Sequence, residues 1–265
     1  MSLKIKNFAK LICVLVAVVL LVAMIPTSSA SAVAYKGSGT KKDPYLVTNA
    51  EQLDGMRNNL SAHYKLANTI DMKSIDNFEP IGFIAKPFTG TFTCDVDKDG
   101  LPKFAIKNIT INNKRGLINK HAPNSGNTPD YKKNNSKWET GLFGMTKGAE
   151  ISNIYVLDAN VICSVVGELS HVYPNGRDNP YVPVKGADEQ GTGILAGMAH
   201  STTFVNCAAT GKVDSKSNYT GGLLGRVEEN SFIEYCWADV DVKSTGCWAA
   251  GAFVGEIISG STIKF

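Results

Sequence analysis

After its first 34 residues, the sequence has no excess of charge of either sign and no second long apolar run. The 265-residue chain carries a formal net charge of +3, and Lys4, Lys6 and Lys10 account for all of it. A neutral remainder does not favour binding to nucleic acid or to an anionic membrane surface. The lack of further apolar runs argues against a membrane span in the mature chain.

Common catalytic signatures and a disulfide framework are also missing. None of the four histidines belongs to an H-E-x-x-H zinc motif, and there is no G-x-S-x-G nucleophile motif or phosphate-binding loop. One of the six cysteines, Cys13, lies in the N-terminal segment, which leaves an odd number without compact spacing. Cys207 and Cys236 are therefore expected to be buried as small apolar residues on adjacent repeats, although a bridge is the alternative.

Residues 1–34 have the pattern of a secretory signal peptide. Three lysines precede an apolar run, Leu11–Ile25, and small residues at Ala30, Ala32 and Ala34 offer cleavage sites. A transmembrane helix needs about 20 apolar residues, so a cleaved signal is favoured over a membrane anchor. We expect a protein that is secreted or held at the cell surface or cell wall.

A glycine-bounded apolar motif recurs through the second half of the chain. Its closing glycines, Gly144, Gly197, Gly225 and Gly255, lie 53, 28 and 30 residues apart. A period of about 28 residues indicates a repeat architecture, and the longer first interval contains an excursion at residues 163–191. That excursion is either a loop or a degenerate repeat, and its proline and polar residues favour a loop.

The repeats predict an all-β fold in which equivalent residues stack. The chain contains 25 glycines and many runs of Val, Ile, Thr and Asn, which favour strands and turns. Asn153 and Asn206 follow their glycines at the same interval, and Asn108 has a similar place ahead of the copies. If each period is one turn of a parallel β-helix, or solenoid, equivalent positions stack about 4.8 Å apart. The asparagines would then bond to one another along the stack.

The order of these features predicts the domain organisation. Asn49 and Gln52 form a capping box that begins one short N-terminal helix, which would cap the solenoid. We expect a signal peptide at residues 1–34, a cap with the first coils at 35–111, a polar loop at 112–139 and the repeats at 140–265.

The Gly-Leu-apolar-Gly copies followed by Ile-x-Asn resemble the GLUG motif of secreted and surface bacterial proteins. The lead-in segments Gly39–Tyr45, Phe78–Gly82 and Phe88–Phe92 are also similar to the sequence that precedes such repeats. The resemblance implies a right-handed parallel β-helix, often in adhesin-like proteins, and implies no enzyme activity. Departures include Thr140 before the first copy and the absence of a wall-sorting motif after the last, which leaves open a truncated product.

Asp95, Asp97 and Asp99, followed by Gly100, have the alternation of a calcium-binding loop. Ile106 stands where such a loop would supply a bidentate glutamate, so a complete EF-hand is excluded. A solvated hairpin turn is the favoured interpretation and a calcium site the alternative. No other cofactor is expected.

Several aromatic and charged residues are candidates for binding. Trp138, Tyr173, Arg177 and Tyr181 fall in the expected loops, where they could stack on a sugar or anchor a protein partner, or pack over the coils. The expected partner is a protein or glycan on a host or neighbouring cell, bound by a monomer. These features favour a non-catalytic adhesion, interaction or spacer module.

The alternatives are a carbohydrate-active enzyme or a fragment of a larger surface protein. The candidate carboxylates of an enzyme are Asp158, Asp239, Asp241 and Glu228, with Arg226 beside the last. A glycosidase requires two carboxyl groups about 5–10 Å apart, which the sequence does not show. Acidic side chains on exposed strands more often serve solubility.

Overall fold

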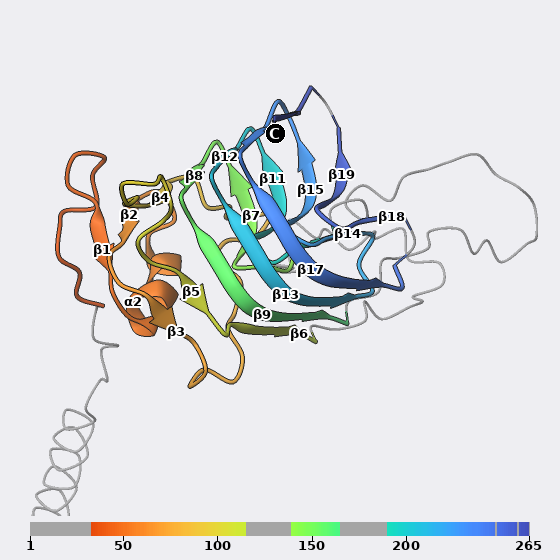
Figure 1. Ribbon diagram of the computed structural model, residues 1–265, viewed down its shortest axis with the longest axis horizontal. Coiled ribbons are helices and arrows are strands. Elements are labelled where there is room, and N and C mark those ends of the chain that lie inside the picture. The colour runs from red at the N-terminus through yellow and green to blue at the C-terminus, as the bar shows by residue number, and fades with distance from the viewer. Residues whose placement is uncertain (1–32, 115–138, 165–189, 247, 259, 265) are drawn as a thin grey trace, which may run out of the picture. The chain divides into compact units, whose positions relative to one another are not determined.

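Short parallel β-strands make up most of the described chain (Figure 1). The computed structural model describes residues 33–114, 139–164, 190–246, 248–258 and 260–264. In these residues one α-helix, α2 (Ala50–Gly55), is followed by the 3-10 helix η1 (Met56–Asn58). None of the helices in this part is long and apolar enough to cross a membrane. The predicted signal peptide lies outside the described residues, except for residues 33 and 34.

The named strands pair in parallel and form four sheets. The seven-stranded sheet contains β1 (Tyr45–Val47), β2 (His63–Leu66), β4 (Thr91–Cys94), β8 (Glu150–Ser152), β12 (Thr203–Val205), β16 (Phe232–Glu234) and β20 (Thr262–Lys264). The six-stranded sheet contains β17 (Trp237–Ser244), β13 (Ala208–Ser215), β9 (Tyr155–Cys163), β5 (Ile106–Lys107) and β3 (Ile70–Asp71), and β6 (Thr110–Asn113) also pairs with β9. The four-stranded sheet contains β19 (Val254–Ile257), β15 (Leu224–Glu228), β11 (Ala196–His200) and β7 (Phe143–Lys147), and the three-stranded sheet contains β10 (Gly191–Thr192), β14 (Tyr219–Gly221) and β18 (Ala249–Gly251).

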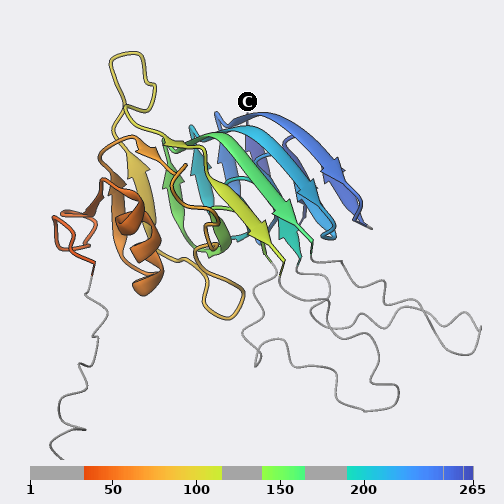
Figure 2. The same ribbon diagram turned by 90° about the horizontal axis from the view of Figure 1, so that it is seen from below.

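Strands from successive repeats lie side by side in register. Ala196 pairs with Phe143 on one side and with Leu224 on the other, which places the closing glycines next to one another. The long strands β9, β13 and β17, coloured green to blue, run alongside each other in Figure 2. The sequence period therefore sets which residues become neighbours.

The prediction of a single right-handed parallel β-helix is wrong. The described residues form four separate parallel sheets of seven, six, four and three strands, not one uniform solenoid. The physical reason lies in residues 35–111, which lack the repeat and supply named strands to only the two larger sheets. Toward the four-stranded sheet they make only the isolated bridges Ile81–Phe143 and Phe88–Thr146. The predominance of β structure agrees with the prediction.

Strands occupy some of the first and last residues of the predicted loops. Asn112 and Asn113, assigned to the polar loop, end strand β6. Cys163, assigned to the excursion, ends β9, and Gly191 begins β10. The rest of both predicted loops lies outside the described residues, apart from the few residues that flank these strands.

Aromatic and aliphatic side chains from all parts of the described chain form the core. Phe88 lies between Tyr64 and Phe143, with ring centroids 6.3 and 4.8 Å apart, and all three rings are buried. The short helix contributes Leu53 and Met56, which have no exposed surface. Its start follows the predicted cap, because Asn49 Oδ1 accepts the Gln52 N–H at 2.9 Å.

The cysteines of the described residues are buried and reduced. Cys94, Cys163, Cys207 and Cys236 are free thiols. Cys207 and Cys236 occupy adjacent repeats, and the Cys207 N–H donates to Cys236 Sγ at 3.3 Å. Burial raises the pKa of the Cys207 thiol well above its ordinary value. The prediction that these two cysteines are buried small residues is confirmed.

Candidate functional site

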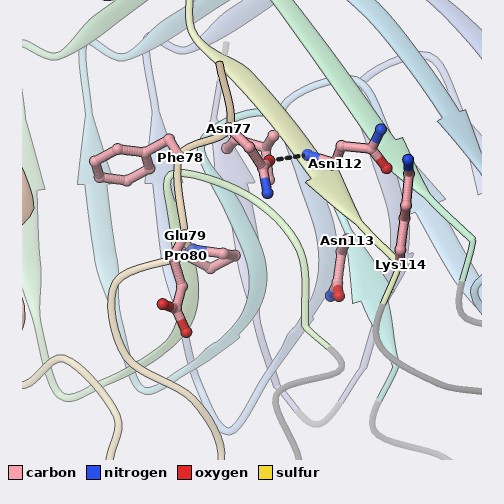
Figure 3. Close-up of a pocket in the computed structure, with 8 residues that line it drawn as sticks. Asn77, Phe78, Glu79, Pro80, Asn112, Asn113 and Lys114 are labelled. Carbon is pink, nitrogen blue, oxygen red and sulfur yellow. Dashed lines mark hydrogen bonds between the residues drawn. The ribbon is translucent and has the colours of Figure 1, made fainter. Parts of the chain in front are cut away.

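A polar pocket of about 410 Å³ lies beside strand β6 (Figure 3). One wall is the segment Asn77–Pro80, and the opposite wall is formed by Asn112, Asn113 and Lys114 at the end of β6. The walls are joined by two hydrogen bonds. The Phe78 N–H donates to the carbonyl of Thr110 at 2.8 Å, and the Asn112 N–H donates to Asn77 Oδ1 at 2.6 Å.

Arg57 supports one wall of this pocket from behind. Its guanidinium donates to the carbonyls of Glu79 at 2.8 Å and Pro80 at 3.2 Å. The same group lies over the buried ring of Phe78, 5.4 Å from its centroid. Because three contacts fix one short segment, this wall is held in place without a ligand.

The polar side chains of the pocket differ in how far they are already satisfied. Asn113 is buried and donates from Nδ2 to Thr140 Oγ1 at 2.9 Å. Asn112 Oδ1 is buried and has no hydrogen-bond partner. Nearly all buried polar groups in proteins are paired, so this oxygen requires an explanation. Lys114, at the rim, is exposed.

A charged cluster lies on the four-stranded sheet and consists of His200, Arg226, Glu228, Glu229 and Glu256. The register places His200 opposite Glu228 and Arg226 opposite Glu256. His200 Nε2 lies 2.9 Å from Glu228 Oε1, and Arg226 Nε lies 2.8 Å from Glu256 Oε2.

Hydrogen bonding and charge within this cluster lower the pKa of Glu228. The side chains of His200, Arg226 and Glu228 are only 11, 12 and 15% exposed. The hydrogen bond to His200 lowers the pKa of Glu228, and the nearby charge of Arg226 lowers it further. Arg226 also lies over the ring of Tyr219, 4.6 Å from its centroid. The cluster is thus a network in which three carboxylates share one guanidinium and one imidazole.

The structure brings together only part of the predicted carboxylate set. Glu228 Oε1 lies 3.5 Å from Arg226 Nη1 in the charged cluster. Asp239 and Asp241 are exposed on β17, and Asp158 is exposed in β9 with a φ of 56°. These three aspartates belong to the six-stranded sheet, whereas Glu228 belongs to the four-stranded one.

The predicted calcium ligands are occupied by contacts within the protein. Asp95 pairs with Lys65 at 2.7 Å, and Asp99 with Lys98 at 3.2 Å. Asp97 Oδ1 accepts the backbone N–H groups of Asp99 and Leu101, which is the pattern of a tight turn. Among the described residues no three His, Cys, Asp or Glu side chains are grouped to hold a metal ion. Calcium binding stays a prediction.

The repeat asparagines occupy turns with left-handed backbone conformation. Asn153 and Asn206 have φ values of 58° and 51°, and Asn206 Nδ2 donates to Asn153 Oδ1 at 2.8 Å. Asn108 also has a φ of 58°, but its amide donates to Asp71 in a different turn. Tyr235, with a φ of 54°, follows Asn206 in the stack. The sequence spacing did not reveal that Tyr235 belongs to this stack, because the turn before it has two residues in the left-handed conformation instead of one.

The four closing glycines allow strands to approach closely. A Cβ on Gly144 would lie 2.4 Å from the Gly82 carbonyl oxygen, and one on Gly225 would lie 2.4 Å from that of Gly197. A Cβ on Gly255 would lie 2.5 Å from a backbone oxygen, and a Cβ on Gly197 would lie 2.6 Å from another. None of the four has a positive φ, so the requirement for glycine is space and not a left-handed turn.

A group of two exposed aromatic side chains and one half-buried one, called here the aromatic patch, was not predicted. It consists of Tyr155, Tyr235 and Trp237. The rings of Tyr155 and Trp237 are 5.7 Å apart in an edge-to-face arrangement, on either side of Ala208. Trp237 is 42% exposed and Tyr235 63%. The sequence feature that allows this contact is the small alanine that lies between the two rings. It can be recognised only when the strand register is known.

The aromatic patch is tied to the asparagine turns. The Tyr155 hydroxyl donates to Asn206 Oδ1 at 3.4 Å. The binding residues predicted from sequence, Trp138, Tyr173, Arg177 and Tyr181, lie outside the described residues.

Comparisons with known proteins assign no family to this chain. No family model and no curated protein matches the sequence. One solved structure resembles it, that of a Bacteroides ovatus protein described as a putative immunoglobulin A1 protease. The similarity has a TM-score of 0.46 at 22% sequence identity and covers 86% of this chain and 69% of that one. The GLUG resemblance stays a prediction.

Proposed function

We propose that this protein is a secreted or cell-surface interaction module that binds a glycan or protein of another surface and catalyses no reaction. The observation that carries the proposal is the aromatic patch. Tyrosine and tryptophan are over-represented among the residues that dominate binding energy, and their rings also stack on sugars. Tyr235 is 63% exposed and Trp237 42%, so both rings are accessible to a partner.

The patch is preorganised, which favours binding. Tyr155 and Trp237 pack against each other, and both belong to strands of one sheet, β9 and β17. Tyr235 projects from a turn whose neighbours, Asn206 and Asn153, are hydrogen-bonded together. The rings of Tyr155 and Trp237, which pack against each other, lose little conformational entropy when a partner binds.

The charged cluster is the feature that would favour the alternative, a carbohydrate-active enzyme. A general acid in such an enzyme needs a carboxyl group with a raised pKa, so that it stays protonated near neutral pH. The pKa of Glu228 is instead lowered by His200 and Arg226. The cluster therefore supports a structural role better than proton donation.

Binding of the mature protein to intact cells and to a glycan array tests the proposal. The variant Tyr235→Ala/Trp237→Ala is expected to lose at least tenfold in affinity. Trp248→Ala is the matched control, because Trp248 is 44% exposed but packs beside Tyr219, outside the patch. Equal binding by the double variant and the wild type would contradict the assignment of the patch.

A parallel assay separates the module from the enzyme. The wild-type protein is incubated with pectins, alginates and glycosaminoglycans, with and without calcium, and new reducing ends or unsaturated products are measured. No turnover is expected. Turnover that Glu228→Gln abolishes would show that the charged cluster is catalytic and that the proposal is wrong.

A further inference from the structure

The aromatic patch is continuous with an exposed hairpin at residues 95–103. The Asn206 side chain joins the two, because its Nδ2 group donates to the Gly100 carbonyl at 3.0 Å and its Oδ1 atom accepts from the Tyr155 hydroxyl at 3.4 Å. We infer that the patch and this hairpin form one docking surface for a protein that presents apolar side chains beside a lysine or arginine. The inference rests on the proposed function and narrows its partner from a glycan or protein to a protein of this chemistry.

The hairpin adds aliphatic side chains to the surface. It is closed by the Asp97 N–H, which donates to the Leu101 carbonyl at 2.8 Å. Leu101 is 53% exposed and Val96 is 38% exposed. Together with Tyr235 and Trp237 they make up four of the six large hydrophobic side chains that are exposed in the described part of the chain. Single exposed apolar residues are ordinary, whereas several gathered in one place mark a site of protein interaction.

The geometry of the rings favours a protein over a glycan. The ring planes of Tyr155 and Trp237 are at 81° to each other. A sugar chain that stacks on two neighbouring rings needs ring faces that point the same way, and rings at nearly right angles do not provide them. The aliphatic Leu101 offers a sugar hydroxyl no hydrogen bond. Aromatic and aliphatic groups together are typical of the apolar centre of a protein interface.

Two exposed carboxylates without a partner lie on the same sheet as the rings. Asp239 follows Trp237 on the exposed face of β17, two residues or about 6.6 Å along the strand. The Asp158 N–H donates to Thr210 Oγ1 at 2.9 Å, and Thr210 is the register partner of Asp239, so the two aspartates flank one threonine. Among the described residues, neither carboxylate has an ion-pair partner or a hydrogen-bond donor.

The charges farther along β13 and β17 already face charges of opposite sign. Lys243 pairs with Asp214 at 2.9 Å, and Asp241 is the register partner of Lys212. The two unpaired aspartates are therefore free to pair with a partner. A lysine or arginine placed beside them would also reach the ring of Trp237, and both the carboxylates and the ring attract a cation.

Binding of the mature protein to treated epithelial cells tests the class of partner. One sample of cells is digested with a protease, and another is oxidised with periodate, which destroys sugars. Protease is expected to lower binding at least tenfold, and periodate is expected to leave it unchanged. Binding that periodate abolishes and protease does not would show that the partner is a glycan. That result would refute the inference and leave the proposed function intact.

Two variants test the extent of the surface. Leu101→Ser removes apolar surface from the exposed hairpin and should bind cells about fivefold more weakly. Asp158→Asn/Asp239→Asn removes both charges with little change in size, and asparagine accepts the φ of 56° at residue 158. Its binding should be about threefold weaker at low salt, and the difference should shrink as salt is added. Ile257→Ser is the matched control, because Ile257 is 39% exposed on the four-stranded sheet and should not affect binding.

The melting temperatures of all these variants are expected to equal that of the wild type, because the altered side chains are exposed. Wild-type binding by both surface variants, with binding lost in Tyr235→Ala/Trp237→Ala, would overturn the inference and keep the aromatic patch. Wild-type binding by Tyr235→Ala/Trp237→Ala would instead show that the proposed function itself is wrong.

Discussion

Replacing Gly197 by alanine tests whether the repeat glycines serve strand packing. The new Cβ would lie 2.6 Å from the Gly191 oxygen and from the Thr140 nitrogen, and 2.9 Å from the Gly144 oxygen. All three are backbone atoms in paired segments, so none can rotate away as a side chain could. Adding atoms to a well-packed interior costs about 1–3 kcal/mol, occasionally more. Three simultaneous backbone contacts place this variant at the upper end, about 3 kcal/mol.

The expected loss corresponds to a fall of about 6–12 °C in melting temperature, because 1 kcal/mol shifts a domain of this size by about 2–4 °C. Urea unfolding followed by circular dichroism measures the free energy directly. Gly148→Ala is the control. Gly148 has a φ of +62° but no atom within 4 Å of an added Cβ, so it should lose only the about 1–2 kcal/mol of a left-handed alanine.

A Gly197→Ala variant that is no less stable than Gly148→Ala would refute this reasoning. The repeat glycines would then need another explanation, such as contact with a ligand.

Three other substitutions probe the core, the charged cluster and the turns. Phe204→Ala should lower the free energy of unfolding in urea by about 3–5 kcal/mol, because the ring is fully buried, and a loss below 1 kcal/mol would contradict its place in the core. Glu228 has a lowered pKa in the folded protein, so its carboxylate stabilises the fold above the ordinary glutamate pKa of about 4.3, and this contribution is lost as the pH falls through the folded-state pKa. The difference in melting temperature between wild type and Glu228→Gln should thus be largest near pH 7 and shrink below about pH 4; a difference that does not depend on pH would show that the charge is not responsible. Asn206→Ala should be less stable to urea than Asn206→Gly by about 1–2 kcal/mol, since both lose the side-chain hydrogen bonds but only alanine resists a φ of 51°; equal stability would contradict backbone strain at this turn.

The sequence revealed local features of the fold well. The cap at Asn49 appears in the structure because it depends on residues only three positions apart. The spacing of the closing glycines likewise placed Gly197 next to Gly144 and Gly225. The first signal is local and the second is a recurring motif, so neither needs information about contacts between unrelated segments.

The overall architecture and the pocket depended on contacts that no local pattern records. Residues 35–111 lack the period, and a pattern from the second half could not show which sheets they would join. In the turn at Glu229 and Asn230, both residues have positive φ, so the stacked residue Tyr235 lies ten residues after its closing glycine, whereas Asn153 and Asn206 lie nine residues after theirs. The pocket requires Asn77 to meet Asn112, which is 35 residues away.

One row of residues crosses the four-stranded sheet and changes its chemistry from repeat to repeat. Met145, Met198, Arg226 and Glu256 are register partners, so thioethers on the first two strands give way to an ion pair on the last two. The adjacent row runs from Thr146 through Ala199 and Val227 to Ile257, and its two middle residues belong to the core. Because Met145 and Met198 are buried and Arg226 pairs with Glu256 on the next strand, a substitution in this row changes the packing or the charge pairing of its neighbour. Residues of this row therefore have to be altered together with their register partners and not one strand at a time.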